Sequence, residues 1–196
     1  MSGGPARQPA PDVRVGSSTD GLAPLSVAER SLAAGPWQWA GLVAVALAAI
    51  VADQVTKHVV VSTLALDESV HVVGPLSIHH VQNTGIAFGF FAGATSVVTI
   101  VTAVAIVWML TFFARSGARH PALPAALGLL AGGSISNLAD RARLGHVTDF
   151  IDFRHWPAFN LADSFIVVGV AILLVALVAT DRSNRPPRRT LDVAAR

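Results

Sequence analysis

Four long apolar segments separated by polar stretches make up most of this chain. They cover approximately residues 37–61, 94–114, 121–142 and 161–180. Each is about 20 residues long, which is the length that an α-helix needs to cross the hydrocarbon core of a bilayer. The pattern therefore predicts four transmembrane helices.

The segments between and around these helices differ in character. Residues 70–91 alternate and are rich in Val, His and Phe, and Gly74-Pro75 marks a turn. This pattern predicts a short antiparallel β element. Residues 143–160 are expected to be a second exposed segment, with Asp152 in a solvated loop. Residues 1–35 are rich in Gly, Pro, Ser and Ala, which predicts a disordered tail.

Composition agrees with a membrane protein. The chain is 53% hydrophobic and only 13% charged, with a mean hydropathy of +0.58. A soluble domain carries about 25% charged residues. The expected fold is an all-α membrane protein with four transmembrane helices and a small extracytoplasmic β element. The expected organisation is a tail at 1–35, a membrane domain at 36–181 and a basic tail at 182–196.

The basic residues predict how the chain sits in the membrane. Most lie in the two tails and in the turn between the second and third segments; the others are Lys57, Arg141, Arg143 and Arg154. The positive-inside rule then places both termini in the cytoplasm. The remaining loops then face outward. The polar ends of the first, third and fourth helices therefore collect near the outer leaflet, where a site is expected. We interpret the basic residues as topology signals and lipid contacts, which argues against a nucleic-acid partner.

Two aspartates lie in apolar surroundings with no basic neighbour in the sequence. They are Asp149, in Val-Thr-Asp-Phe-Ile, and Asp163, in Asn-Leu-Ala-Asp-Ser-Phe. Ionisable groups at membrane depth are costly and usually functional. Burial raises the pKa of a carboxyl group, and a second carboxylate nearby raises it further, so a pair can share one proton. This is the arrangement of an aspartic protease. A proton relay, or a helix N-cap role for Asp163, remains an alternative.

Other polar residues support more than one interpretation. Asp140 precedes Arg141, which favours a structural salt bridge or a cap. Asn83, Asn137 and Asn160 could hold a substrate, orient a carboxylate or join helices. Asn160 and Asp163 are three residues apart and share one helix face.

The only lysine, Lys57, lies four residues after Asp53, which predicts a helical ion pair. Its alternative is an interfacial anchor whose side chain reaches toward the headgroups. A Ser–Lys protease would use Lys57 as its base with Ser62, Ser134 or Ser136, but no serine lies in a recognisable site. The seven histidines form no metal signature, and cysteine is absent. We therefore expect no metal and no cofactor.

Five motifs together resemble lipoprotein signal peptidase, also called signal peptidase II. They are the segments 53–57 (DQVTK), 83–88 (NTGIAF), 132–141 (GGSISNLADR), 147–152 (VTDFID) and 159–164 (FNLADS). The resemblance covers roughly residues 37–180. One position departs from it, because Ser136 stands where the family more often has Gly; a serine there would crowd a helix contact or add a hydrogen bond.

The resemblance implies an aspartyl protease of the bacterial inner membrane. Such enzymes cleave prolipoproteins just before a diacylglyceryl-modified cysteine, and the cyclic peptide globomycin inhibits them. The implied catalytic pair is Asp149 and Asp163. The implied supporting or substrate-binding residues are Asp53, Lys57, Asn83, Gly85, Asn137, Asp140, Arg141 and Asn160. The rival interpretations are a proton-coupled transporter, which would spread its carboxylates through the membrane depth, and a structural membrane subunit.

Overall fold

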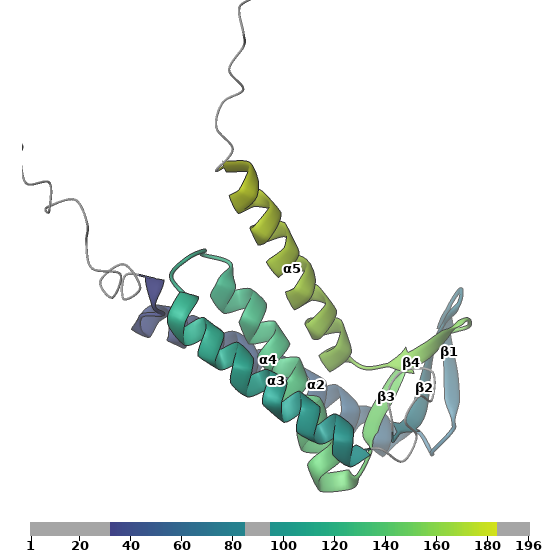
Figure 1. Ribbon diagram of the computed structural model, residues 1–196. Coiled ribbons are helices and arrows are strands. Elements are labelled where there is room, and N and C mark those ends of the chain that lie inside the picture. The colour runs from purple at the N-terminus through teal and green to yellow at the C-terminus, as the bar shows by residue number, and fades with distance from the viewer. Residues whose placement is uncertain (1–31, 85–94, 184–196) are drawn as a thin grey trace, which may run out of the picture.

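The computed structural model describes residues 32–84 and 95–183 (Figure 1). Its helices are α2 (Pro36–Thr63), α3 (Thr95–Ser116), α4 (Leu123–Leu144) and α5 (Leu161–Ser183). Each helical segment expected from the sequence is present, with ends that differ by a few residues. Two of these helices contain stretches long and apolar enough to cross a membrane, Pro36–Thr63 and Ser96–Ser116, and α5 has a shorter apolar stretch, Leu161–Ala176.

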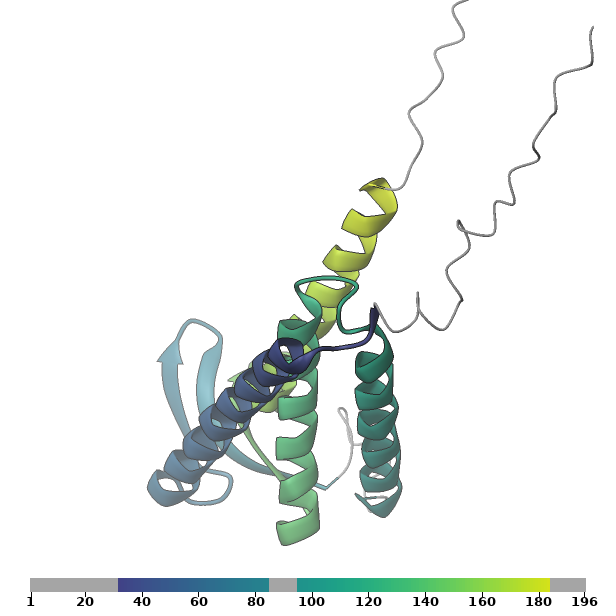
Figure 2. The same ribbon diagram turned by 90° about the vertical axis from the view of Figure 1, so that its left-hand side faces the viewer.

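Helix α4 lies at the centre of the bundle, between α2 and α3 in the view of Figure 2, and it also packs along α5. Glycines make these contacts close. A Cβ added to Gly132 would lie 2.6 Å from the carbonyl oxygen of Ala46 on α2, and one added to Gly169 would lie 2.7 Å from that of Ala126. Small residues at such positions let membrane helices approach backbone to backbone. This close approach brings the polar groups of α2, α4 and α5 within hydrogen-bonding distance.

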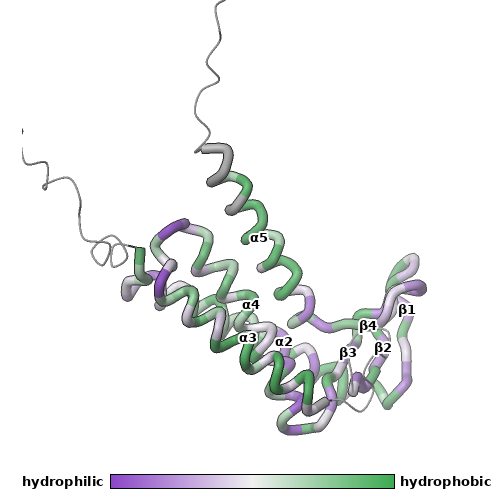
Figure 3. Tube along the Cα trace, in the orientation of Figure 1, coloured by the Kyte–Doolittle hydropathy of each residue, from purple (hydrophilic) through white to green (hydrophobic). Residues whose placement is uncertain are grey.

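The outer surface of the bundle is apolar. Helix α2 exposes a stripe of residues four apart: Val43, Leu47, Val51, Val55 and Val59. Its opposite face buries Asp53 and Lys57. Figure 3 shows that apolar residues dominate the helices, while polar residues gather at the α3–α4 turn and where α5 meets the sheet. An apolar exterior around buried charges is typical of a protein surrounded by lipid.

The β element is larger than the sequence predicted. Strands β1 (Ser69–Val73), β2 (Leu76–Asn83), β3 (Val147–Phe153) and β4 (Trp156–Phe159) form one antiparallel sheet in the order β1-β2-β3-β4. The expectation of a loop at 143–160 was therefore wrong, and Asp152 lies on β3. The first four residues of β3 are all buried, so the strand lacks the alternation that would identify it.

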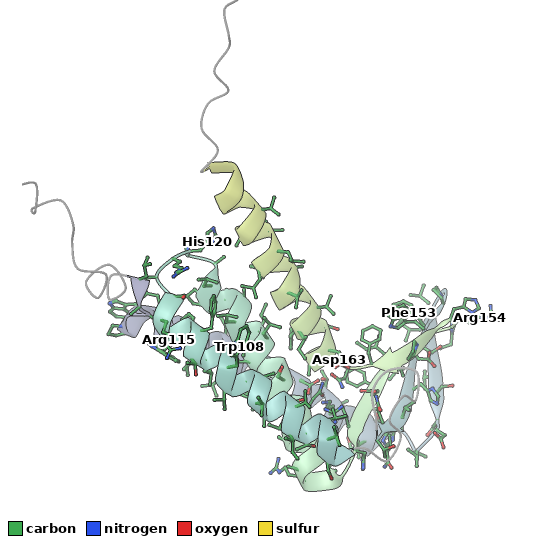
Figure 4. The ribbon with its side chains drawn as sticks, in the orientation of Figure 1. Trp108, Arg115, His120, Phe153, Arg154 and Asp163 are labelled. Atoms are coloured by element: carbon green, nitrogen blue, oxygen red, sulfur yellow. The ribbon has the colours of Figure 1, made fainter. Side chains whose placement is uncertain are left out.

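The sheet lies at one end of the helix bundle. Strand β3 contacts both α2 and α4 there, and α5 begins directly after β4. Arg115 and His120 mark the opposite end in Figure 4. The predicted tails lie mostly outside the described residues, as do Gly85 and the rest of the expected β segment up to residue 91.

Candidate active site

Asp163 is fixed in the first turn of α5 by a reciprocal capping arrangement. The backbone N–H of Asp163 donates to Oδ1 of Asn160 at 3.0 Å, and the backbone N–H of Asn160 donates to Oδ2 of Asp163 at 3.3 Å. Since α5 begins at Leu161, Asn160 is its N-cap and Asp163 its third residue. This arrangement satisfies two N–H groups that a helix start leaves free. The carboxylate also lies near the positive end of the helix dipole.

Asp149 stands on β3 with only 2% of its surface exposed. Its Oδ2 accepts a hydrogen bond from Nδ2 of Asn83 at 2.9 Å, and its Oδ1 accepts one from Nδ2 of Asn160 at 2.7 Å. Asn160 therefore bridges the two aspartates: its amide nitrogen binds the Asp149 carboxylate, and its amide oxygen binds the Asp163 backbone. Strand β3 and the start of α5 meet at this one side chain.

Burial raises the pKa of Asp149 from the ordinary value of 3.8 to about 6. The negative charge of Asp163 raises it further, whereas the hydrogen bonds from Asn83 and Asn160 and the charge of Lys57 lower it. Desolvation is the largest of these effects, because an ionised carboxylate is poorly stabilised away from water. Asp149 therefore keeps its proton to a much higher pH than an exposed aspartate does.

This pKa predicts how stability depends on pH. Between 3.8 and about 6 the folded protein retains the Asp149 proton while the unfolded chain releases it. The stabilisation from this group is thus present below 3.8 and is lost as the pH rises through about 6. Such a shift corresponds to on the order of 3 kcal/mol. Denaturation in detergent micelles across this range should show the decline, and Asp149→Asn should lose this part of it. An unchanged slope in the variant would contradict the prediction.

Both aspartates line one largely apolar cavity between α5 and the sheet, with a volume of about 570 Å³. Its polar side chains include Asn83, Asn137 and Arg141, and its apolar wall includes Trp156, Phe159 and Val167. A second cavity of about 470 Å³ lies on the α3 side and shares Asn137, Arg141 and Asp163 with the first. In Figure 4, Asp163 lies at the start of α5 beside the sheet. The arrangement places two acidic groups at the edge of apolar space.

Lys57 lies beneath these aspartates and is only 5% exposed. Its Nζ lies 2.7 Å from Oδ2 of Asp53, 2.6 Å from Oδ2 of Asp140 and 2.8 Å from Oδ1 of Asn137. The predicted Asp53–Lys57 pair is confirmed, and the alternative of a lysine reaching toward the headgroups is wrong. The pair between Asp140 and Lys57 was not predicted, because the sequence drew attention to the neighbouring Arg141.

Asp53 is completely buried and joins three helices. Its Oδ1 accepts a hydrogen bond from the backbone N–H of Ala162 on α5 at 2.9 Å, and its Oδ2 accepts one from the Ser136 hydroxyl on α4 at 2.7 Å. Ser136 therefore adds a hydrogen bond, which confirms one of the two expectations for this position. The hydroxyl also accepts a bond from Gln54 Nε2 at 3.0 Å, and Gln54 donates to Asp140 as well.

These contacts disfavour a Ser–Lys catalytic pair. The ammonium of Lys57 binds two carboxylates and an amide, and the Ser136 hydroxyl donates to Asp53. Ser62 is exposed and donates to the carbonyl oxygen of Val59. Sequence reasoning missed Gln54 as a member of the buried network; its only signal was that it is a further polar residue between Asp53 and Lys57.

Arg141 and Asp152 both lie near the two aspartates, but they make different contacts. Arg141 lines both cavities, and its Nη1 donates to the backbone oxygen of Asn137 at 3.4 Å. Asp152 is half-buried and pairs with Nδ1 of His79 at 3.0 Å. Asp152 occupies the opposite side of β3 from Asp149, since it faces a different, polar hollow beside His71 and Arg154. It does not belong to the candidate site.

The fold and the buried polar site together define a membrane enzyme. The chain aligns with a solved bacterial membrane enzyme at a TM-score of 0.69 and 29% identity, covering 74% of this chain and 91% of that one. A second such structure gives a TM-score of 0.65 at 30% identity, over 70% and 92% of the two chains.

The family profile described as signal peptidase (SPase) II matches residues 45–179, and the chain belongs to this family of peptidases. A lipoprotein signal peptidase of Pelotomaculum thermopropionicum is 40% identical over 142 residues, which is 71% of this chain and 93% of that protein. One of Geobacter sulfurreducens is 40% identical over 152 residues, covering 73% and 94%. The resemblance found in the five motifs is confirmed.

Proposed function

We propose that this protein is an aspartic endopeptidase of the bacterial cytoplasmic membrane. It removes the signal peptide from diacylglyceryl-modified prolipoproteins by cutting just before the lipidated cysteine. One observation carries the proposal: in a chain of the signal peptidase II family, Asp149 and Asp163 are bridged by Asn160 and line the same apolar cavity.

In this mechanism the two aspartates hold one proton between them. The ionised carboxylate takes a proton from a water molecule as the water oxygen attacks the scissile carbonyl carbon. The protonated carboxyl gives its proton to the carbonyl oxygen, so a tetrahedral diol forms. Collapse of the diol breaks the C–N bond: the first carboxyl gives its proton to the departing amine, and a diol hydroxyl returns its proton to the second carboxylate, which restores the dyad. The raised pKa of Asp149 supports a shared proton near neutral pH.

The surroundings of the site suit a substrate that carries acyl chains. The main cavity is lined mostly by apolar side chains, among them Trp156, which is 62% exposed. On the sheet, the rings of Phe153 and Phe159 stack with their centroids 6.1 Å apart. We infer that the sheet covers the peptide while the acyl chains remain in the lipid beside α5. A cyclic peptide inhibitor such as globomycin would occupy the same cavity.

The supporting residues divide into two groups. Asn83, Asn137, Arg141 and Asn160 line the cavity or bind the aspartates, so they would hold the substrate and the dyad in register. Asp53, Lys57 and Asp140 form the buried frame beneath. Gly85 lies outside the described residues, and its supporting role rests on the resemblance alone.

The proposed topology has four membrane-spanning helices and both termini in the cytoplasm. The sheet and the aspartates then lie near the outer leaflet, and Arg115 and His120 lie at the cytoplasmic end. Residues 1–35 and 182–196 would be cytoplasmic tails. The apolar exterior of the bundle and the position of the charged turn between α3 and α4 support this orientation.

The test uses the purified full-length protein and a synthetic prolipoprotein peptide. One form of the peptide carries a diacylglyceryl group on its cysteine, and the matched control peptide has the same sequence with a free cysteine thiol. We expect cleavage of the lipidated peptide only, with mass spectrometry giving a product that begins at the modified cysteine. The Geobacter sulfurreducens relative serves as a positive control. Cleavage elsewhere, or none where the relative is active, would refute the proposal.

A further inference from the structure

The orientation of the Asn137 amide is determined by Lys57. An ammonium group can only donate hydrogen bonds, so the Asn137 atom 2.8 Å from Lys57 Nζ must be the amide oxygen. The amide nitrogen then points the other way, and it lies 2.8 Å from Oδ1 of Asp163. An N–H group cannot accept, so this oxygen of Asp163 must be the acceptor. The direction of the whole chain of bonds follows from the charge on Lys57.

A second chain of bonds agrees with this orientation. The backbone N–H of Asp163 can only donate, so the atom of the Asn160 amide that faces it must be the oxygen. The amide nitrogen of Asn160 then donates to Oδ1 of Asp149, and it also lies 3.2 Å from Oδ1 of Asn137. The Asn137 oxygen thus accepts from both Lys57 and Asn160. Each assignment supports the other.

We propose that Lys57 is a positioning residue for the dyad: through Asn137 it holds Asp163 as a hydrogen-bond acceptor. The inference rests on the proposed function and adds a residue that positions the dyad within it. Lys57 lines neither cavity; it reaches the dyad through its hydrogen bond to Asn137 and through its positive charge.

The alternative orientation shows why Lys57 matters. If the Asn137 amide turned over, its oxygen would face Oδ1 of Asp163, a contact that is favourable only when Asp163 is protonated. It would also turn an N–H group toward the ammonium of Lys57. Lys57 is buried between Asp53 and Asp140, which keep the ammonium in place. The amide is therefore held in the orientation that suits an ionised Asp163.

The charges around the dyad come from every element packed against it. Lys57 and Asp53 are on α2, Asp140 and Arg141 are on α4, and Asp149 is on β3. Of these charged groups Lys57 donates to the Asn137 amide oxygen, and together with Asn160 Nδ2 it sets the amide orientation.

The sharpest variant is Asn137→Asp. It keeps the oxygen that meets Lys57 and replaces the N–H group that donates to Asp163 with a second carboxylate oxygen, which also adds a negative charge there. A second variant, Lys57→Met/Asp140→Asn, removes the ammonium and one of its two carboxylate partners, so the cluster with Asp53 keeps one net negative charge. In both we expect kcat for the lipidated peptide to fall about 100-fold with KM changed less than about threefold. The acid limb of the kcat/KM profile should move to higher pH.

The matched control is Ser136→Ala. It removes hydrogen bonds to Asp53 and Gln54 from the same buried cluster but none to Asn137. We expect a lower thermal midpoint and an acid limb at the wild-type pH. A wild-type acid limb in Asn137→Asp, or in a folded double variant, would overturn the role of Lys57 even with a lower kcat. A wild-type enzyme that leaves the lipidated peptide intact would instead overturn the proposed function and this inference with it.

Discussion

Asp149→Asn and Asp163→Asn should each remove nearly all cleavage of a lipidated prolipoprotein peptide while the protein stays folded. An amide can neither take a proton from water nor pass one to the substrate, so the loss should be at least about 10²–10⁴-fold in kcat. The change is nearly isosteric, and burial of a neutral group at Asp149 removes a desolvation cost rather than adding one. Single-turnover assays at saturating peptide would measure the chemical step.

The control for this experiment is Asp152→Asn. Asp152 is on the same strand as Asp149 but pairs with His79 on the other side of the sheet, away from the cavity. We expect its kcat to stay within about twofold of wild type, in the range of an ordinary surface substitution. If Asp152→Asn were as inactive as Asp149→Asn, the cavity would have been assigned to the wrong face of the sheet.

Asp53→Asn should have the largest effect on stability. Asp53 is fully buried and accepts bonds from Ala162, Ser136 and Lys57. An asparagine can still accept from Ala162, but its N–H group would then face the Lys57 ammonium. Removing one partner of a buried ion pair costs about 3–5 kcal/mol. Chemical denaturation in detergent micelles would measure the change in the free energy of unfolding.

Ser136→Ala provides the comparison for Asp53→Asn. It removes a neutral hydroxyl from the same oxygen of Asp53, so it should cost only about 1–3 kcal/mol. The order of the two effects is the informative result. Equal losses would mean that the charge of Asp53 contributes little and that its hydrogen bonds alone join the three helices.

The sequence was sufficient to find the candidate dyad. Asp149 and Asp163 stand out because each lies among apolar residues with no basic neighbour, and no three-dimensional information is needed to see this. The four helical segments were also predictable, since long apolar runs bounded by charged residues have few alternative structures. Their alternating directions already placed the polar ends of α2, α4 and α5 together.

The remaining features depend on packing that a single sequence does not reveal. Strand β3 was missed because Val147 to Phe150 are buried on both faces. The burial of Lys57 follows from its partners on α4, which lie about 80 residues further along the chain. Gln54 and Ser136 meet across the contact between α2 and α4, where Gly132 lets the two helices approach closely. Contacts of this kind need the helices to be docked first.

The bridge made by Asn160 has a consequence for the life of the protein in the cell. Asp149 and the frame around Lys57 belong to segments that precede the last helix, whereas Asn160 and Asp163 arrive with it. A nascent chain whose final segment has not yet inserted therefore holds Asp149 without Asn160 or Asp163, and the candidate site is complete only after α5 has docked.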